Sequence, residues 1–305
     1  MPHRKNSKKK ESREIQGMII DDNFLELAPP IFEPELYKQI RNMSEIKEFC
    51  KNFWEWNKYV PWLVYEDSQP HKELMAQLTS LMRDKVGDSC ADFGCGYGEF
   101  LTHLLQLGEC TIRKYFAIDL DWQALAAIPG NLRKTSYRGK RVYFIHTAAM
   151  FKSDLRTESV DSVISSLGAL MYAWAWFDKN GKQVASNREA FVKGLRDVYR
   201  ILKPGGYLGI SAPLPNPDWR KIRNQSLKHL VFHEFSLKKI WETIWYGTKA
   251  VRYSRFMNGL EKEGKAHYLS PQEWKQYLED VGFKIETIEV DCFAGQGVIV
   301  IARKK

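Results

Sequence analysis

The stretch Cys90-Ala91-Asp92-Phe93-Gly94-Cys95-Gly96-Tyr97-Gly98 decides the fold class of this 305-residue chain. Its first four residues read as a buried strand, and three glycines then alternate with other residues. Glycines let a backbone turn sharply and approach a ligand without a Cβ in the way. An apolar helix is predicted at 99–106, and its first turn offers free N–H groups to polar ligand atoms. The stretch thus predicts a strand, a ligand-binding turn and a helix, although glycines alone also fit an ordinary tight turn.

Short strands and helices alternate on both sides of this turn. Such alternation predicts βαβ units and a doubly wound, parallel α/β sheet. In that fold the turn after the first strand lies at the carboxyl edge of the sheet, where cofactors bind. The predicted strands are 89–93, 115–119, 141–146, 160–166, 207–211, 283–290 and 297–302, and the predicted helices are 99–106, 122–127, 188–202 and 271–281.

Asp119 ends the second predicted strand, 21 residues after Gly98. An acid at this position can accept hydrogen bonds from both ribose hydroxyls of an adenosyl group. Its alternative role is a helix N-cap, for which Asp121 is better placed. Glu99 stands where the dinucleotide fingerprint needs its last glycine, so the spacing here is G-x-G-x-G instead.

Two further features follow along the chain. Val160-Asp161-Ser162-Val163-Ile164-Ser165 reads as a buried central strand entered by an acid. Leu202-Lys203-Pro204-Gly205-Gly206-Tyr207 ends a helix and turns through two glycines into the next strand. Each of these features is ordinary when taken separately.

Together these four features resemble the class I S-adenosylmethionine-dependent methyltransferase family, particularly its small-molecule branch of the ubiquinone-biosynthesis type. The similar regions are residues 88–213 and 269–305. The resemblance implies an enzyme with a Rossmann-like, seven-stranded sheet whose last strand, Gly297–Ala302, is antiparallel. It also implies that Asp92 and the backbone of 94–98 hold the methionyl part of S-adenosylmethionine, and that Asp119 holds its ribose.

The predicted cofactor contacts depart from the family pattern after the third strand. Many family members place an aspartate there for the adenine amino group, whereas this chain has Ala148-Ala149-Met150-Phe151. Met150 or Phe151 either packs against adenine or fills the core, and Asp154 is a more distant partner for the amino group. At the end of the fourth strand, Ser165–Gly168 lacks the N/D-P-P-Y motif of enzymes that methylate nucleic-acid amino groups. The full predicted set is Asp92, Gly94, Cys95, Gly96, Gly98, Asp119, Leu120, Met150 and Ser165.

The chain divides by composition into five parts. They are a disordered basic tail (1–17), an N-terminal helical segment (18–88, with helices at 33–58 and 71–82), the cofactor-binding core (89–213), an insertion (214–268) and the rest of the core (269–305). The insertion is basic and rich in aromatic residues, and it predicts two or three short helices over the sheet edge. They form either a cap over the substrate or the core of an accessory helical layer.

The catalytic residue stays unassigned. Methyl transfer from a sulfonium is an in-line displacement, in which holding the reactants in line supplies much of the rate. A general base is needed only if the acceptor loses a proton, and the candidates are His229, His233 and Glu234, each of which also fits a surface position. No histidine, cysteine or carboxylate spacing indicates a metal site, so we expect metal-independent transfer.

Composition limits the partners and the location. The net charge of +9 favours anionic partners, and the tail is either solvated or a nucleic-acid-binding arm or localisation signal. The longest apolar run (167–177) is too short to span a bilayer, and no apolar stretch follows the N-terminal charges. Five cysteines without a C-x-x-C pair predict a cytoplasmic protein.

We expect a small-molecule or lipid-like acceptor, with RNA or protein as the alternative. A cofactor-binding protein without catalysis is a third interpretation. Peripheral membrane contact and the oligomeric state stay open.

Overall fold

A seven-stranded sheet forms the centre of the computed structural model, which describes residues 13–15, 18–20, 51, 68–108, 111–120, 122–132, 141–146, 153, 155–178 and 182–305. The strand order is β10-β11-β9-β6-β3-β4-β5. All neighbours pair in parallel except β11, which is antiparallel to β9 and β10. The doubly wound sheet with an antiparallel last strand is therefore confirmed. The bounds are β3 Ser89–Phe93, β4 Lys114–Asp119, β5 Arg141–His146, β6 Val160–Ser166, β9 Leu202–Pro213, β10 Phe283–Asp291 and β11 Gly297–Lys304.

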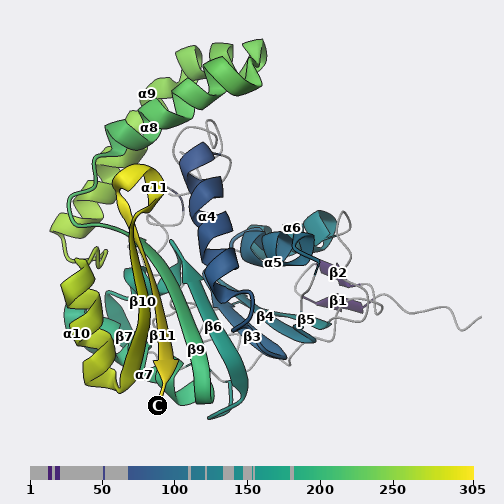
Figure 1. Cartoon of the computed structure of the whole chain (residues 1–305), viewed down its shortest axis with the longest axis vertical. Coiled ribbons are helices and arrows are strands. Elements are labelled where there is room, and N and C mark those ends of the chain that lie inside the picture. The colour runs from purple at the N-terminus through teal and green to yellow at the C-terminus, as the bar shows by residue number, and fades with distance from the viewer. Residues whose placement is uncertain are drawn as a thin grey trace, which may run out of the picture.

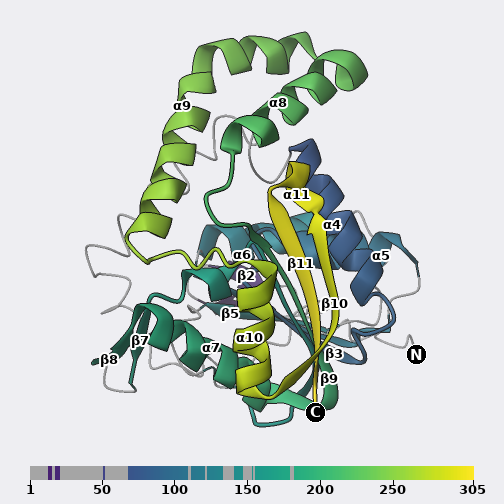
Figure 2. The ribbon, with the colours of Figure 1, turned by 60° about the vertical axis from the view of Figure 1, so that its left-hand side comes forward.

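Helices cover both faces of this sheet (Figures 1 and 2). On one face lie α4 (Gln69–Met82), α5 (Glu99–Gln106) and α6 (Trp122–Leu132), and on the other lie α7 (Asn187–Ile201) and α10 (Pro271–Val281). Because both faces are covered, all five residues of the central strand β3 are buried. Ser270 and Glu273 form a capping box that begins α10, and Gly282 ends it in the left-handed conformation.

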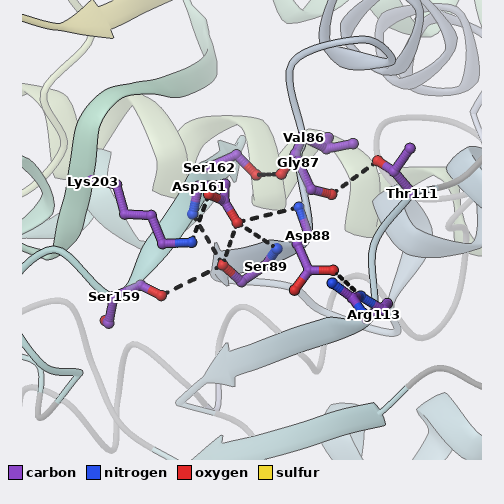
Figure 3. A network of polar contacts seen from close by, with 10 residues as sticks. All are labelled: Val86, Gly87, Asp88, Ser89, Thr111, Arg113, Ser159, Asp161, Ser162 and Lys203. Carbon is purple, nitrogen blue, oxygen red and sulfur yellow. Dashed lines mark hydrogen bonds and ion pairs between the residues drawn. The ribbon is translucent and has the colours of Figure 1, made fainter.

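Asp161 joins three strands at the amino-terminal edge of the parallel strands (Figure 3). Its Oδ2 accepts hydrogen bonds from the backbone N and Oγ of Ser89 at 2.9 and 2.7 Å, and its Oδ1 contacts Nζ of Lys203 at 2.7 Å. Burial raises the pKa of Asp161, but the bonds from Lys203 and Ser89 outweigh it and leave the pKa below its ordinary value. The acid of the central strand and the lysine of the K-P-G-G turn thus form one contact. Residues 203–206 bulge out between the paired residues Leu202 and Tyr207.

The N-terminal region differs from the expectation. Two three-residue strands, β1 (Arg13–Ile15) and β2 (Met18–Ile20), pair antiparallel where a disordered tail and the start of a helical segment are expected. That expectation is wrong for these residues, because the isoleucines on both sides of Gly17 favour strand. The helix expected at 33–58 lies outside the described residues, apart from Lys51, which is helical.

The insertion contains two α-helices, the second of which is long, where two or three short helices are expected. It consists of α8 (Trp219–His229), a single π-helical turn η2 (Leu230–Glu234) and the 26-residue α9 (Leu237–Lys262). No proline interrupts residues 219–262, and a Cβ added to Gly247 would meet nothing within 4 Å. We call residues 219–262 the arm, which extends beyond the sheet in both views (Figures 1 and 2). Within the described ranges, no helix has the length and apolar composition needed to cross a membrane.

The apolar run 167–177, which is too short to span a bilayer, forms two short elements. A 3-10 turn, η1 (Ala169–Tyr172), follows β6 directly. The short strand β7 (Ala175–Phe177) then pairs with β8 (Gln183–Ser186). A short turn, α11 (Cys292–Gly295), joins β10 to β11.

Candidate active site

The glycine turn after β3 is held by the neighbouring strand β4. The backbone N–H groups of Gly94 and Cys95 both donate to the carbonyl of Ile118, at 2.8 and 3.1 Å. Gly98 N donates to the carbonyl of Cys95 at 2.9 Å and begins α5 in the left-handed conformation. These bonds fix the turn at the carboxyl edge of the sheet, the edge where ligands bind in this fold.

The three glycines of the turn have different surroundings. A Cβ added to Gly94, at φ +80°, would lie 2.4 Å from the backbone N of Ala169. A Cβ on Gly98 would lie 3.1 Å from the side chain of Ile128. A Cβ on Gly96 would meet nothing within 4 Å. Gly94 is therefore needed for packing against the segment after β6, whereas Gly96 borders open space.

Two carboxylates face the turn. Oδ2 of Asp119 accepts a hydrogen bond from Gly96 N at 2.9 Å, so the acid that ends β4 holds the middle of the glycine turn. Asp92 is buried in β3, and the hydroxyl of Tyr115 in β4 donates to its Oδ2. Burial raises the pKa of Asp92 to about 7; the Tyr115 bond lowers it and the charge of Asp119 raises it further. The site is thus acidic and partly protonated at neutral pH.

Other predicted cofactor residues lie around the same turn. Cys95 is buried within it, and burial together with the charges of Asp119 and Asp92 raises its thiol pKa well above the ordinary value. Ser165 in β6 donates through Oγ to the carbonyl of Phe93 at 3.1 Å. Leu120 follows Asp119 and is partly buried against the core. Met150 lies outside the described residues.

Sequence reasoning missed the segment that packs against the turn. A Cβ on Gly168 would lie 2.4 Å from the carbonyl of Phe93, so η1 begins in direct contact with the end of β3. The only sequence signal is the Ser165–Gly168 stretch, which we used solely for the absence of a motif. Tyr115 was missed as well, because nothing in an apolar strand marks which residue will reach Asp92.

The other end of η1 contacts His267 and Tyr268, two residues that line a cavity of about 490 Å³. Met171 accepts a backbone hydrogen bond from His267 at 2.8 Å, and the buried hydroxyls of Tyr172 and Tyr268 lie against one another. Burial lowers the pKa of His267 to about 4 and raises that of Glu261 above its ordinary value. The cavity is lined by polar and charged side chains from the start of α7, the end of α9 and the start of α10, including Arg188, Glu261, His267, Tyr268 and Glu273.

The three candidate bases gather on the arm instead. The rings of His229 and His233 stack with centroids 5.1 Å apart, and Nε2 of His229 lies 3.7 Å from Oε1 of Glu234. Lys239 contacts Glu234 at 2.5 Å and is the main cause that lowers the pKa of this carboxyl. None of these recorded contacts involves the glycine turn, so the described structure brings the three candidates to one another and not to the turn.

Comparison with known proteins decides the family. Residues 67–288, well over half of the chain, match a family of methyltransferase domains. The chain belongs to this methyltransferase family. It is a class I S-adenosylmethionine-dependent enzyme with S-adenosylmethionine as its cofactor, as the sequence predicts. A comparison with the curated proteins gives no match.

Solved structures share the fold at low sequence identity. A Bordetella parapertussis protein described as a possible exported protein is 20% identical, with a TM-score of 0.51, over 76% of this chain and 67% of that one. The 1,6-didemethyltoxoflavin N1-methyltransferase of Burkholderia thailandensis, with S-adenosylhomocysteine bound, is 13% identical, with a TM-score of 0.50, over 92% and 93%. An S-adenosylmethionine-dependent methyltransferase of Mesorhizobium loti is 18% identical, with a TM-score of 0.45, over 75% and 96%.

The residues of this methyltransferase fit its cofactor. S-adenosylmethionine carries a positive sulfonium and a positive amino group, and Asp92 and Asp119 supply two carboxylates beside the turn. The space beside Gly96 lets the ligand approach the backbone closely. Helix α5 begins directly after the turn, and the N-terminus of a helix favours an anionic group of a ligand.

Proposed function

We propose that this methyltransferase transfers the methyl group to a small-molecule or lipid-like acceptor, as in the ubiquinone-biosynthesis-like branch. The observation that carries the proposal is η1, which contacts the glycine turn at Gly168 and the wall of the cavity at Tyr172. We therefore place the acceptor in that cavity. A cavity of about 490 Å³ has the size of small-molecule sites and is too small for a folded macromolecule.

The cofactor residues of the proposal are those of the glycine turn and its neighbours. Asp119 would accept hydrogen bonds from the ribose, while Asp92 and the backbone of 94–98 would hold the methionyl part. Cys95, Leu120, Met150 and Ser165 would complete the walls. The new bond forms between the acceptor and the methyl carbon while the carbon–sulfur bond breaks, so the chain's main contribution is to hold the two in line. The proposed transfer requires no metal, and its rate should not change with chelators.

A proton must leave when the acceptor is a hydroxyl or an enol. We propose Glu261 as the group that receives it, because burial shifts its pKa upward and it lines the cavity. His267 is neutral and places Nε2 3.3 Å from the carbonyl of Ala173, so it serves to position the wall. His229, His233 and Glu234 remain alternative bases if the acceptor reaches the arm.

Calorimetric titration with S-adenosylmethionine tests the cofactor site. Asp119→Ala should weaken binding by about 2–4 kcal/mol, the value of two hydrogen bonds to a charged group. Asp88→Ala is the matched control, because Asp88 contacts Arg113 near the start of β3, at the opposite edge of the sheet. Equal affinities of the two variants would remove Asp119 from the site.

Product release tests the acceptor cavity. Release of S-adenosylhomocysteine in the presence of a lipid extract should fall by at least about tenfold in Glu261→Gln, while calorimetric cofactor affinity stays unchanged. A loss of cofactor affinity instead would show that Glu261 supports the fold of the site and receives no proton.

RNA or protein is the alternative acceptor. Ten lysines and arginines stand against three glutamates in the arm, which favours an anionic partner. The salt dependence of binding distinguishes an RNA acceptor from a small-molecule or lipid-like one, because each phosphate contact releases counterions.

A further inference from the structure

Six large apolar side chains of the arm are at least 66% exposed. The exposed fractions are 69% for Trp241 and 74% for Trp245, and the other four side chains lie between 66% and 77%. We call the six residues the apolar patch: Phe232, Phe235, Leu237, Trp241, Ile244 and Trp245. Soluble proteins seldom expose so many large apolar side chains together without a partner.

Helical spacing places four of the six on one side of α9. Leu237, Trp241, Ile244 and Trp245 stand at positions i, i+4, i+7 and i+8, which share one face of a helix. The residues of α9 that pack against the core (Ala250, Tyr253, Ser254, Met257 and Leu260) lie on the other side and in the second half of the helix. The first half of α9 is therefore an amphipathic helix whose apolar face points to solvent.

The π-helical turn extends the patch past the start of α9. Phe235 adopts the left-handed conformation at φ +40°, which an aromatic residue seldom does. It ends η2, and its N–H donates to the carbonyl of Leu230 at 2.9 Å. The turn leaves Phe232 and Phe235 exposed next to Leu237 instead of folding them onto the core.

Positive charges flank the apolar patch along α9. The arm carries ten lysines and arginines and three glutamates, against a net charge of +9 for the whole chain. Arg252 and Arg255 continue the outer face of α9 beyond Trp245, and both are exposed. Lys238 is exposed beside Leu237 and pairs with Glu242 only at 3.9 Å.

We propose that the apolar patch docks the arm on an anionic lipid bilayer together with the flanking cations Lys238, Arg252 and Arg255, which we call the basic rim. Tryptophan prefers the membrane interface, and amphipathic helices with large rings and flanking cations lie in the headgroup region. Lysine and arginine near the surface are attracted by anionic lipids. A second copy of the chain would bring two strongly positive arms together, which Coulomb repulsion opposes.

Sedimentation with vesicles of phosphatidylcholine, with and without phosphatidylglycerol, tests the proposal on the full chain. Binding should require phosphatidylglycerol and should fall by at least about tenfold in the double variant Trp241→Gln/Trp245→Gln. The matched control is Leu107→Gln/Val184→Gln, which removes two exposed apolar side chains outside the arm and should bind as the native chain does. Unchanged thermal unfolding in both double variants would show that folding is intact.

A second measurement, vesicle binding by single arginine variants, tests the basic rim. Arg252→Gln and Arg255→Gln should each weaken binding to anionic vesicles by about fivefold and reduce its sensitivity to salt. Equal binding to neutral and anionic vesicles, or no binding by the native chain, would overturn the proposal. So would a native dimer that the tryptophan double variant converts to monomer, because the patch would then be a self-association surface. None of these measurements depends on methyl transfer, so they stand apart from the proposed reaction.

Discussion

Asp92 shows how a single residue serves binding at the expense of stability. Its carboxyl is buried in the central strand with the Tyr115 hydroxyl as its recorded hydrogen-bond donor. The nearby charge of Asp119 opposes its ionisation. A cationic ligand would relieve this repulsion, because it supplies the opposite charge that the described surroundings of Asp92 lack.

Cofactor affinity should therefore rise with pH as Asp92 ionises. Burial raises the pKa of Asp92 to about 7, and only the ionised carboxylate attracts the amino group that we assign to it. Calorimetric titrations with S-adenosylmethionine on both sides of pH 7 measure the change. Asp92→Asn should bind weakly at every pH; a native-like rise in affinity in this variant would assign the titration to another group.

Protein stability should follow pH in the opposite direction. Between the ordinary value of 3.8 and about 7, the folded chain keeps a proton on Asp92 that the unfolded chain has lost. The free energy of unfolding therefore falls as pH rises through this window and is lowest above it. Thermal unfolding of the native chain and Asp92→Asn should show the variant gaining relative stability as pH rises from the ordinary value of 3.8 to about 7, and a constant difference above that. A constant difference across the window would contradict the shifted pKa.

At the scale of elements, the glycine turn couples β3, β4 and η1. Gly94 and Gly108 have nearly the same backbone conformation, at φ +80° and +82°, so an alanine at either position brings a left-handed strain of about 1–2 kcal/mol. Only at Gly94 does the added methyl group meet backbone, at 2.4 Å. Thermal unfolding should therefore show Gly94→Ala to be clearly less stable than Gly108→Ala. Equal stabilities would mean that η1 moves freely away from the turn.

Gly96→Ala separates binding from folding in the same turn. Its methyl group meets nothing within 4 Å, so its effect on thermal unfolding should resemble that of Gly108→Ala. Cofactor affinity should nevertheless fall, because the methyl group enters the space that we assign to the ligand. Native affinity in Gly96→Ala would place the cofactor elsewhere.

The elements best predicted from the sequence are those with local chemical signals. The bounds of β3, α5 and α10 agree with the prediction, because glycines, a proline and a capping box mark their ends. The length of α9 was not predicted, because an irregular spread of aromatic residues reads as several short helices. Its exposure was not predicted either: a cap over the substrate or the core of a helical layer would bury Trp241 and Trp245, but both are exposed.

The residues of the site also fall into those that a sequence pattern predicts and those that it does not. Asp92, Asp119 and the glycines carry a recognisable spacing along the chain, and the structure brings them together at one turn. Gly168 and Tyr268 contribute through contacts with residues distant in sequence, which no local pattern reveals. Three-dimensional packing was therefore needed to find the cavity and the contact of η1 with its wall.

Charge is the property that matters at the scale of the whole molecule. Two basic regions, the N-terminal tail and the arm, account for much of the net charge of +9. The structure gives the arm a second property, since exposed cations flank its exposed aromatic rings along α9. Lipid and RNA both attract cations, but only a bilayer interface also accommodates an apolar face, and this difference separates the two classes of acceptor.

The last prediction uses the tail to distinguish RNA from a small or lipid-like acceptor. Deleting residues 1–12, which leaves β1 and β2 in the chain, should barely change S-adenosylhomocysteine release with a lipid extract. An RNA acceptor requires a different result: binding to total RNA would fall steeply with salt, with a log–log slope of about −0.7 for each phosphate contact on single strands. Replacing Lys8, Lys9 and Lys10 with glutamine would then flatten the slope by about two. Product release with total RNA that disappears with the tail would overturn the small-acceptor proposal, because the tail would then be delivering the substrate.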